Sequence, residues 1–354
     1  MNVQRERPSL TGIERQELEA WVEGEGEKRY RAGQILEWVY GKRAEGVGEM
    51  SNLGKGFRER LDESFALHTA RVVERQGSED ATRKYLLRLH DGRHVECVLI
   101  PPSVGWGGEV SDRRTLCVSS QVGCAYDCKF CASGLAGFTR NLDAGEIVEQ
   151  LLVVERESGE RVSNIVFMGM GEPLANLRNV TKAIRILNAP WGVEIGARHM
   201  TVSTSGLAPQ IEKMASEPIS FRLAISLHGA TDDVRERIMP VNRKYPIERL
   251  FEAIKVWRSK RKQKITLEYI LIEGVNDGID QAKVLGRRAK SVGAKVNLIP
   301  YNQVDGLEWR RPEESVQEQF LAVVKAGGAP ATLRREKGGD IDAACGQLRL
   351  RREN

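Results

Sequence analysis

Strand-like and helical runs alternate from Thr115 to Arg334, and this alternation restricts the possible folds more than any other feature of the 354-residue chain. Strands that alternate with helices form parallel sheets, because each helix carries the chain back to the start of the next strand. About six such units without closure signals predict an α/β fold with a partial (β/α)6 barrel. The strand-like runs are Thr115–Ser119, Asn164–Met168, His199–Thr204, Arg222–Leu227, Ile265–Ile272, Lys295–Pro300 and Ala331–Arg334.

The N-terminal ~70 residues are expected to form a small helical domain. A T-x-x-E capping box at Thr11 and Glu14 predicts the start of one helix, and further helices are expected at Gln34–Tyr40 and Phe57–Phe65. Basic residues surround these helices, and for any single one a solvated face is a better interpretation than a phosphate contact. They are Lys28, Arg29, Arg31, Lys42, Arg43, Lys55, Arg58 and Arg60.

Strand-like runs with a hairpin turn at Asp91-Gly92 predict a short β extension between the helical region and the alternating region. The chain is therefore expected to contain four parts. They are a helical accessory domain (1–70), a β extension (71–112), the partial barrel (113–335) and a C-terminal loop (336–354).

The composition is that of an ordinary globular protein, with 41% apolar and 29% charged residues. The net charge of +5 is weak evidence for a polyanionic partner. No uninterrupted apolar stretch approaches the roughly 20 residues that a membrane-spanning helix needs, so no membrane association is expected. Six cysteines are too sparse for a disulfide framework, and the N-terminus has no apolar signal segment, which predicts a reducing cytoplasm.

Cys124, Cys128 and Cys131 form a C-x-x-x-C-x-x-C motif in the run GCAYDCKFCASG. Three thiolates on a [4Fe–4S] cluster leave one iron open, and an open iron can chelate a small molecule. A structural zinc site is the main alternative, but zinc takes four closed ligands. The chain has no second C-x-x-C, and His90 and His94 lack ligand spacing. The motif therefore favours an iron–sulfur cluster with an open iron.

This motif is the signature of the radical SAM enzymes, which the chain resembles. The resemblance implies that S-adenosylmethionine (SAM) binds the open iron, and that an electron from the cluster splits it into methionine and a 5′-deoxyadenosyl radical. The loop Gly169-Met170-Gly171-Glu172-Pro173 resembles the family's loop for the SAM amino group, although a bare G-x-G is weak evidence. Polar residues at later strand ends match a set for the rest of SAM, although each also fits a plain strand-end cap. The implied SAM-binding residues are Gly171, Glu172, Ser203, Ser226, Leu227, His228 and Asn302.

Longer segments resemble, more narrowly, the RlmN family of bacterial RNA methyltransferases. They include TLCVSSQVGC (Thr115–Cys124), FCASGLAGFTRNL (Phe130–Leu142), FMGMGEPLAN (Phe167–Asn176) and GDIDAACGQL (Gly339–Leu348), and the resemblance spans almost the whole chain. It implies methylation of carbon 2 of adenine 2503 in 23S rRNA and of adenine 37 in some tRNAs. The expected partners are these RNAs and an electron donor such as flavodoxin or ferredoxin, and the protein is expected to be a monomer.

Carbon 2 of adenine is electrophilic and has no lone pair, so ordinary methyl transfer from SAM fails there. The resemblance implies that Cys345 takes a methyl group from one SAM, and that a radical from a second SAM activates this group for addition to carbon 2. Glu96 then accepts the carbon-2 proton, and Cys117 forms a disulfide with Cys345 to release the base. From the residues alone, both cysteines also fit core positions, and Glu96 fits a solvent-facing strand position. Glycines around Cys345 favour a mobile loop, and Cys97 is interpreted as a packing residue.

Two features depart from the family pattern. The loop Ser103–Arg113 is longer than usual, and the chain ends soon after Cys345 with a basic tail containing Arg349, Arg351 and Arg352. Both are expected to affect RNA contacts only. A sister family methylates carbon 8 of the same adenine, but its members tend to have GEA, STIG and LIRYN where this chain has GEP, STSG and LIPYN. A non-catalytic RNA-binding iron–sulfur protein is the alternative from another class, and it predicts no SAM cleavage on reduction.

Overall fold

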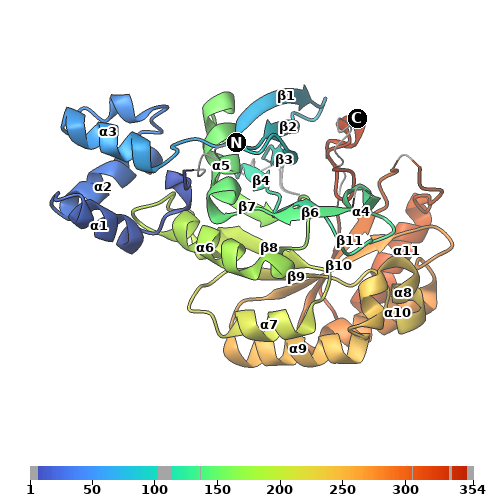
Figure 1. Ribbon diagram of the computed structural model, residues 1–354. Coiled ribbons are helices and arrows are strands. Elements are labelled where there is room, and N and C mark those ends of the chain that lie inside the picture. Colours follow the sequence, from blue (N-terminus) through green and yellow to red (C-terminus); the bar gives the residue numbers. More distant parts are fainter. Residues whose placement is uncertain (1–6, 103–112, 136, 305, 335–336, 349–354) are drawn as a thin grey trace.

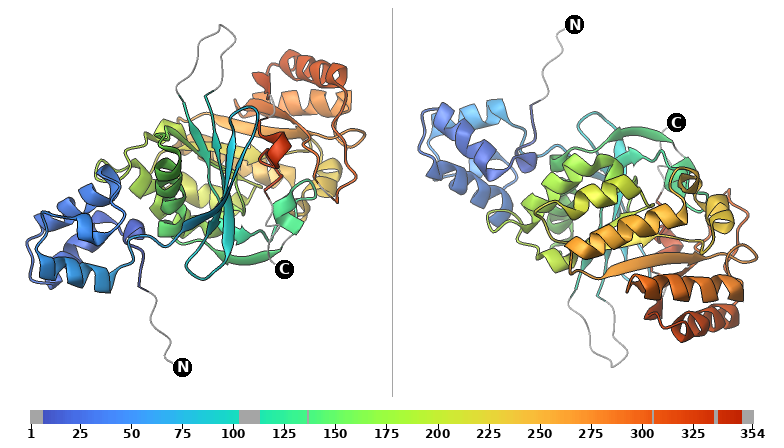
Figure 2. Two further views of the ribbon diagram at one scale, coloured as in Figure 1. Left: turned by 90° about the horizontal axis from the view of Figure 1, so that it is seen from above. Right: turned by 90° about the horizontal axis from the view of Figure 1, so that it is seen from below.

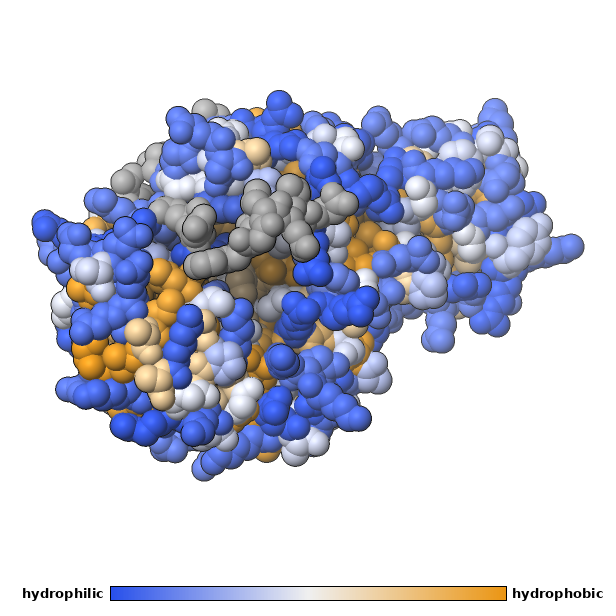
Figure 3. Space-filling model, turned by 180° about the vertical axis from the view of Figure 1, so that it is seen from behind, coloured by the Kyte–Doolittle hydropathy of each residue, from blue (hydrophilic) through white to orange (hydrophobic). Residues whose placement is uncertain are grey.

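The computed structural model describes residues 7–102, 113–135, 137–304, 306–334 and 337–348. The long loop expected at Ser103–Arg113, except for its last residue, and the basic C-terminal tail lie outside the described residues. A lobe of N-terminal helices lies beside a large sheet, and further helices cover one face of that sheet (Figures 1 and 2). From behind, hydrophilic residues cover most of both parts, and hydrophobic residues gather in patches over the larger one (Figure 3). No helix in the described ranges has the length and apolar character needed to cross a membrane.

The N-terminal lobe, residues 7–67, consists of three α-helices with short 3-10 and π-helical turns. Its elements are η1 (Leu10–Gly12), α1 (Arg15–Gly24), α2 (Tyr30–Leu36), η2 (Glu37–Gly41), η3 (Val47–Glu49) and α3 (Lys55–Ser64). Trp21 lies at its centre, with ring centroids 5.6 Å from Phe57 and 4.9 Å from Phe65. The predicted helical character of this region is confirmed.

The capping box expected at Thr11 and Glu14 is wrong. Glu14 is itself the N-cap of α1, and its backbone N–H donates to Glu17 Oε2 at 2.8 Å. Thr11 is fully buried in η1, where the lobe packs so closely on α5 (Ala144–Ser158) that a Cβ on Gly12 would lie 2.7 Å from the backbone nitrogen of Gly145. The tertiary contact therefore determines the conformation of Thr11, and the local motif does not.

The β extension is part of the main sheet. Its strands β1 (Arg71–Gly77), β2 (Arg83–Arg88) and β3 (His94–Ile100) are antiparallel, and β3 pairs with β4 (Thr115–Cys117). The predicted turn at Asp91-Gly92 is present, with Gly92 at φ +83°. The segment before β1 is hydrogen-bonded to α5, because the Glu149 carboxylate of that helix accepts the backbone N–H groups of Thr69 and Ala70.

The remaining strands of the sheet are parallel, as predicted. They are β4, β7 (Asn164–Phe167), β8 (Met200–Thr204), β9 (Arg222–Ser226), β10 (Ile265–Leu271), β11 (Lys295–Pro300) and β12 (Ala331–Leu333). Within the described residues the sheet order runs from β1 to β12 without closing, so the barrel is partial. Each of the seven predicted strand runs corresponds to one of these strands, and five of the strands end one or two residues earlier than predicted.

Helices connect the parallel strands. They are α5 (Ala144–Ser158), η4 (Pro173–Asn176), α6 (Leu177–Asn188), η5 (Ala197–His199), α7 (Ala208–Ala215), α8 (Asp232–Ile238), η6 (Pro240–Arg243), α9 (Ile247–Lys260), α10 (Ile279–Ser291) and α11 (Glu314–Ala326). The predicted cap of α5 is present: Asp143 Oδ1 accepts the N–H of Glu146 at 2.8 Å, and Glu146 Oε2 accepts the N–H of Asp143.

Residues along a strand alternate between the two faces of the sheet, so the register assigns each one to a face. One aligned set is apolar and fully buried, which identifies the face that the helices cover. It includes Leu116, Ile165, Val202, Leu223 and Val296. The next residue along these strands belongs to the opposite face. That set is more polar and includes Cys117, Ser203, Ser226, Glu268 and Asn297.

Two short segments border this polar face. A ribbon of β5 (Gln121–Gly123) and β6 (Phe138–Asn141) encloses the cysteine motif and α4 (Ala132–Leu135). The C-terminal segment contains η7 (Gly339–Ile341) and then Cys345.

Candidate active site

A cavity opens on the polar face, at the C-terminal ends of the parallel strands. The empty space within it, including the part open to solvent, is about 880 Å³. The cysteine motif, the loop after β7 and several strand ends form its lining. The predicted site residues in that lining are Cys124, Cys128, Cys131, Gly171, Glu172, Ser203, Ser226, His228 and Cys345. Residues far apart in the sequence thus meet at one place.

A tight turn after β5 presents the three cysteines to the cavity. Gly123 has φ +73°, and a Cβ there would lie 1.9 Å from the carbonyl oxygen of Gly137, so the turn requires glycine. The backbone N–H of Cys124 donates to Gly137 O at 2.8 Å, and that of Cys131 donates to Cys128 O at 3.0 Å. These bonds fix the loop from which the three thiols extend.

The donor set of this loop fits an iron–sulfur cluster. Burial raises the pKa of Cys124 to about 12 and also raises the pKa of Cys128 and Cys131, so the thiols need a cationic partner to ionise. In the part of the chain that the structure describes, no three His, Cys, Asp or Glu side chains converge closely enough to hold one metal ion. A cluster takes one thiolate per iron, so it needs soft donors spread around a cavity, as these three thiols are.

Two glycines let the loop after β7 pack against the chain that follows β4. A Cβ on Gly169 would lie 2.7 Å from Ser119 Oγ. Gly171 has φ +97°, and a Cβ there would lie 2.5 Å from Gln121 Cβ. The N–H of Glu172 donates to Gln121 Oε1 at 2.8 Å. The glycines of the G-x-G pattern therefore serve a close backbone approach that places Glu172 on the cavity wall.

The Glu172 carboxylate is buried and accepts two backbone N–H groups, from Leu174 at 2.9 Å and from Ser205 at 2.6 Å. Burial raises the pKa of Glu172, and the two N–H donors oppose that shift. A buried carboxylate gains most from a cationic ligand group, so this position suits an ammonium.

His228 presents a neutral donor to the same cavity. Its Nδ1 accepts the N–H of Ile270 at 3.0 Å, so the ring proton is on Nε2. Burial lowers the pKa of His228 to about 3, which keeps the ring uncharged at neutral pH. Phe130 packs edge-on against it, with ring centroids 4.6 Å apart. Ser203 and Ser226 add hydroxyl groups from the ends of β8 and β9.

Two predicted residues, Leu227 and Asn302, lie outside the lining of this cavity. Leu227 is fully buried, and its carbonyl oxygen accepts from Arg235 Nε at 3.1 Å. Asn302 Nδ2 donates to the carbonyl oxygen of Cys345 at 3.1 Å, and its Oδ1 accepts from Arg311 Nη2 at 3.1 Å. The amide of Asn302 thus holds the loop of Cys345.

The loop that carries Cys345 docks on the cluster loop. The N–H of Ala132 donates to Gly346 O at 2.7 Å, and Ser133 Oγ donates to Leu348 O at 2.8 Å. The loop expected to be mobile is therefore held in place in this structure. All six cysteines are free thiols.

Arg334 follows β12, and its Nη1 donates to Cys345 Sγ at 3.0 Å. The charge of Cys345 contributes most to raising the pKa of Arg334. The charges of Glu268 and Cys117 raise it further, and burial opposes the shift. A guanidinium at this distance stabilises a thiolate. No sequence motif points to Arg334, although it stands directly after a parallel strand, as Ser203 and Ser226 stand at strand ends.

Cys117 and Glu96 lie on the cavity side of the sheet but beyond the cavity lining. Cys117 is opposite Val98 in the β3–β4 pair, two residues from Glu96. Burial, and next the charge of Cys345, raise the pKa of Cys117 to about 12. Glu96 is only 5% exposed, so it does not face solvent, and its Oε1 lies 3.4 Å from Lys84 Nζ.

Arg235 is a second functional residue to which no sequence motif points. It is fully buried and donates to Leu227 O at 3.1 Å, Ser205 O at 2.6 Å and Asn242 Oδ1 at 2.8 Å, which ties the ends of β8 and β9 together. A Cβ on Gly229 would lie 2.5 Å from the Arg235 backbone nitrogen, so glycine is needed there. In the run DDVRERI, Arg235 looks like any exposed helical arginine, and no sequence signal distinguishes it.

Comparisons with known proteins agree with this arrangement. Residues 118–282 match the radical SAM superfamily, and residues 9–67 match the ribosomal RNA large subunit methyltransferase N-terminal domain. A crystal structure of a radical SAM methyltransferase from Sphaerobacter thermophilus matches with a TM-score of 0.91 at 41% identity, covering 97% of this chain and 99% of that one. The expected fold, a radical SAM partial barrel with a small N-terminal helical region, is confirmed.

Curated relatives narrow the family. A probable dual-specificity RNA methyltransferase RlmN of Akkermansia muciniphila is 51% identical over 346 residues, which cover 98% of this chain and 96% of the relative. A probable dual-specificity RNA methyltransferase RlmN 3 of Opitutus terrae is 52% identical over 357 residues, with the same shares covered. The radical SAM superfamily implies a [4Fe–4S] cluster and SAM, for which the cavity has suitable donors. The chain therefore belongs to the RlmN family of radical SAM RNA methyltransferases.

Proposed function

We propose that the protein methylates carbon 2 of adenine 2503 in 23S rRNA and of adenine 37 in some tRNAs, with two SAM molecules consumed per methyl group. One observation carries this proposal: the thiol of Cys345 lines the same cavity as the cysteine motif, with the Arg334 guanidinium on its sulfur. A thiol in that place can accept a methyl group and carry it to a base in the same cavity.

Cys124, Cys128 and Cys131 would hold the [4Fe–4S] cluster, which binds and cleaves SAM to supply a 5′-deoxyadenosyl radical. The buried carboxylate of Glu172 would bind the SAM amino group. The rest of SAM would contact Gly171, Ser203, Ser226 and His228. Leu227 is buried outside the cavity lining and would support these residues by packing. Asn302, which holds the Cys345 carbonyl, would act by positioning that loop.

The protein's own residues would then act in order. The Cys345 thiolate attacks the methyl carbon of SAM and forms an S–CH₃ bond, while the thioether of S-adenosylhomocysteine leaves. After the methyl group has lost a hydrogen atom to the 5′-deoxyadenosyl radical and added to carbon 2, one electron would return to the cluster and Glu96 accepts the carbon-2 proton. Cys117 attacks the sulfur of Cys345 and breaks its bond to the methylene carbon, which forms a disulfide. The released carbon takes up the proton that the Cys117 thiol loses and becomes the methyl group of the base. Lys84, whose Nζ lies 3.4 Å from Glu96 Oε1, would hold that carboxylate in position for the proton transfer.

Arg334→Met is expected to slow the alkylation of Cys345 by iodoacetamide at neutral pH roughly tenfold, because the guanidinium stabilises the thiolate. Arg334→Lys keeps the positive charge and should restore most of the rate. Mass spectrometry of the Cys345 peptide over time measures both rates. Equal rates in the wild type and the Arg334→Met variant would show that the contact at 3.0 Å does not activate the thiol.

We also propose that the 1–70 domain binds RNA, that flavodoxin or ferredoxin donates the electron, and that the protein acts as a cytoplasmic monomer. Of the other three predicted parts of the chain, residues 71–112 would extend the sheet and residues 113–335 would hold the cofactors. Residues 336–354 would carry the methyl-accepting cysteine. The match of residues 9–67 to a ribosomal RNA methyltransferase domain supports an RNA role for the lobe. Two of its basic residues are bound in ion pairs, Arg29 with Glu19 inside the lobe and Arg43 with Glu155 of α5, so these two have structural partners and are not the residues expected to contact RNA.

Mass spectrometry of RNA tests the proposed reaction. The reconstituted, reduced protein is incubated with SAM and an unmodified 23S rRNA fragment containing the target adenine, and the digested nucleosides are separated. 2-Methyladenosine is expected. 8-Methyladenosine would instead assign the activity of the sister family, and reduction without any SAM cleavage would support the non-catalytic alternative.

A further inference from the structure

A second cleft lies between the N-terminal lobe and the turn that joins β2 to β3. Its empty volume is about 1240 Å³, and basic side chains dominate its lining. Arg7, His68, Arg71, Arg88 and His90 line it together with Asp143. The cleft is thus chemically unlike the cavity that holds the cysteine motif, and it suits an anion.

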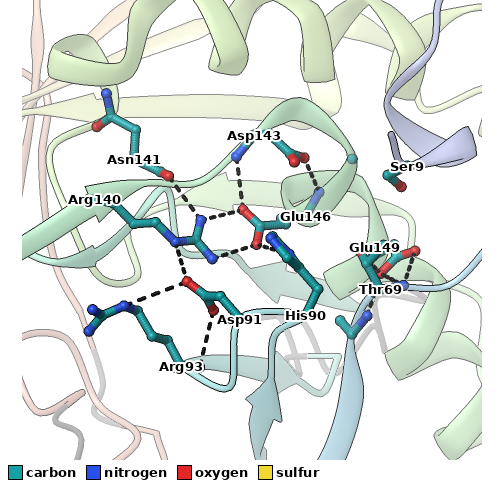
Figure 4. A network of polar contacts seen from close by, with 12 residues as sticks. Ser9, Thr69, His90, Asp91, Arg93, Arg140, Asn141, Asp143, Glu146 and Glu149 are labelled. Carbon is teal, nitrogen blue, oxygen red and sulfur yellow. Dashed lines mark hydrogen bonds and ion pairs between the residues drawn. The ribbon is translucent and has the colours of Figure 1, made fainter. Parts of the chain in front are cut away.

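The carboxylates around this cleft are already bound by the protein itself (Figure 4). Arg140 donates to both oxygens of Glu146 at 2.7 Å and to Asp91 Oδ2 at 2.7 Å. Asp143 caps α5, and Glu149 accepts the backbone N–H groups of the segment before β1. These acidic groups therefore have their own partners and do not neutralise the cleft's remaining cations.

Arg71 and Arg88 are the cations that remain. Both are exposed, and they stand directly opposite each other in the β1–β2 pair. Like charges in opposed positions destabilise a sheet. Within the described ranges, no ion pair relieves either guanidinium. Two arginines at opposed positions that line one cleft suit the oxygens of a phosphate diester, because each guanidinium can donate two parallel hydrogen bonds.

The register places this pair beside the candidate active site. Arg88 lies on the same face of β2 as Lys84, the residue that contacts Glu96. The partner of Arg88 on β3 is His94. His94 is two residues from Glu96, a separation of about 7 Å along the strand. Because β3 is antiparallel to β4, this end of the hairpin extends past the C-terminal end of β4, toward the edge where the cavity opens.

We propose that Arg71 and Arg88 together bind one backbone phosphate of the RNA substrate, next to the nucleotide that enters the cavity. This inference rests on the proposed function, because it takes RNA as the substrate. An adenine that is unstacked into an enclosed site leaves its flanking phosphates at the rim, where a protein must hold them to keep the base extruded. The bound phosphate also removes the repulsion between the two guanidiniums, which offsets the cost of placing them opposite each other.

The test compares full-length variants in binding to an RNA stem–loop that carries the target adenine, over a series of salt concentrations. Arg71→Gln/Arg88→Gln should bind the RNA roughly tenfold to a hundredfold more weakly, with a slope of log affinity against log salt that is smaller by about one. Arg75→Gln is the matched control, because Arg75 is also exposed on β1 but pairs with Tyr85 at a position of the opposite face. This control should keep the wild-type affinity and slope.

Thermal unfolding separates loss of binding from loss of folding. The double variant should melt at the wild-type temperature or higher, because it removes a like-charge pair. An unchanged salt slope, or an equal loss of affinity in Arg75→Gln, would overturn the proposal. The proposal would also be overturned if inorganic phosphate raised the melting temperature of the wild type alone while the wild type and the double variant bound RNA with equal affinity. The two arginines would then bind a free anion only. Reductive SAM cleavage by the wild type without RNA tests the proposed function separately, and its failure would leave the binding comparison intact.

Discussion

Cys117→Ala protein is expected to accumulate a covalent adduct with RNA, attached through Cys345. Radical addition to the base remains possible in this variant, but no thiol is left to attack the sulfur and release the product. Cys345→Ala is expected to behave differently: it should lose methylation entirely, because no thiol accepts the first methyl group. RNA that co-purifies with the protein under denaturing conditions measures the adduct, and peptide mass spectrometry measures the methyl group on Cys345.

Cys97→Ala is the matched control for this pair of variants. Cys97 is fully buried on β3 but pairs with Tyr85 at a position of the face opposite to Glu96, so its removal affects packing only. It should form no adduct and should keep its turnover. Normal turnover of Cys117→Ala without any adduct would contradict the release scheme and would leave Cys117 as a core residue.

Replacement of any one of Cys124, Cys128 or Cys131 by alanine is expected to remove most of the iron and sulfide that the wild type binds after anaerobic reconstitution, about four of each per chain. Each thiolate holds one iron, so a variant with only two of the three motif ligands should not retain the cluster. Reductive SAM cleavage should be lost with the cluster. Iron and sulfide analysis, together with the visible absorption band of the cluster, measures the effect.

Cys345→Ala and Cys97→Ala provide the comparison, because both remove a cysteine outside the motif. Both should retain the full iron and sulfide content. If Cys124→Ala kept the wild-type content, the assignment of the motif as the cluster ligand set would be wrong.

Much of this molecule could be predicted from local sequence patterns. The parallel strands and their helices follow from alternating apolar runs, the cap of α5 follows from Asp143 and Glu146, and the β2–β3 turn follows from Asp91-Gly92. These features depend on residues that are close in the chain, so short-range physical chemistry is sufficient to predict them. The rule that polar residues gather at C-terminal strand ends also placed Ser203 and Ser226 at the cavity.

Tertiary structure decided the features that depend on distant residues. The box at Thr11 failed because packing of the N-terminal lobe on α5 buried that residue. Strand register sets the contact of Lys84 with Glu96 and the pairing of Arg71 with Arg88, and docking of the C-terminal segment on the cluster loop sets the contact of Arg334 with Cys345. A basic or acidic residue has the same local sequence signal whether it faces water or a partner. Only the fold shows which charges are paired, which are buried, and which remain available for a ligand.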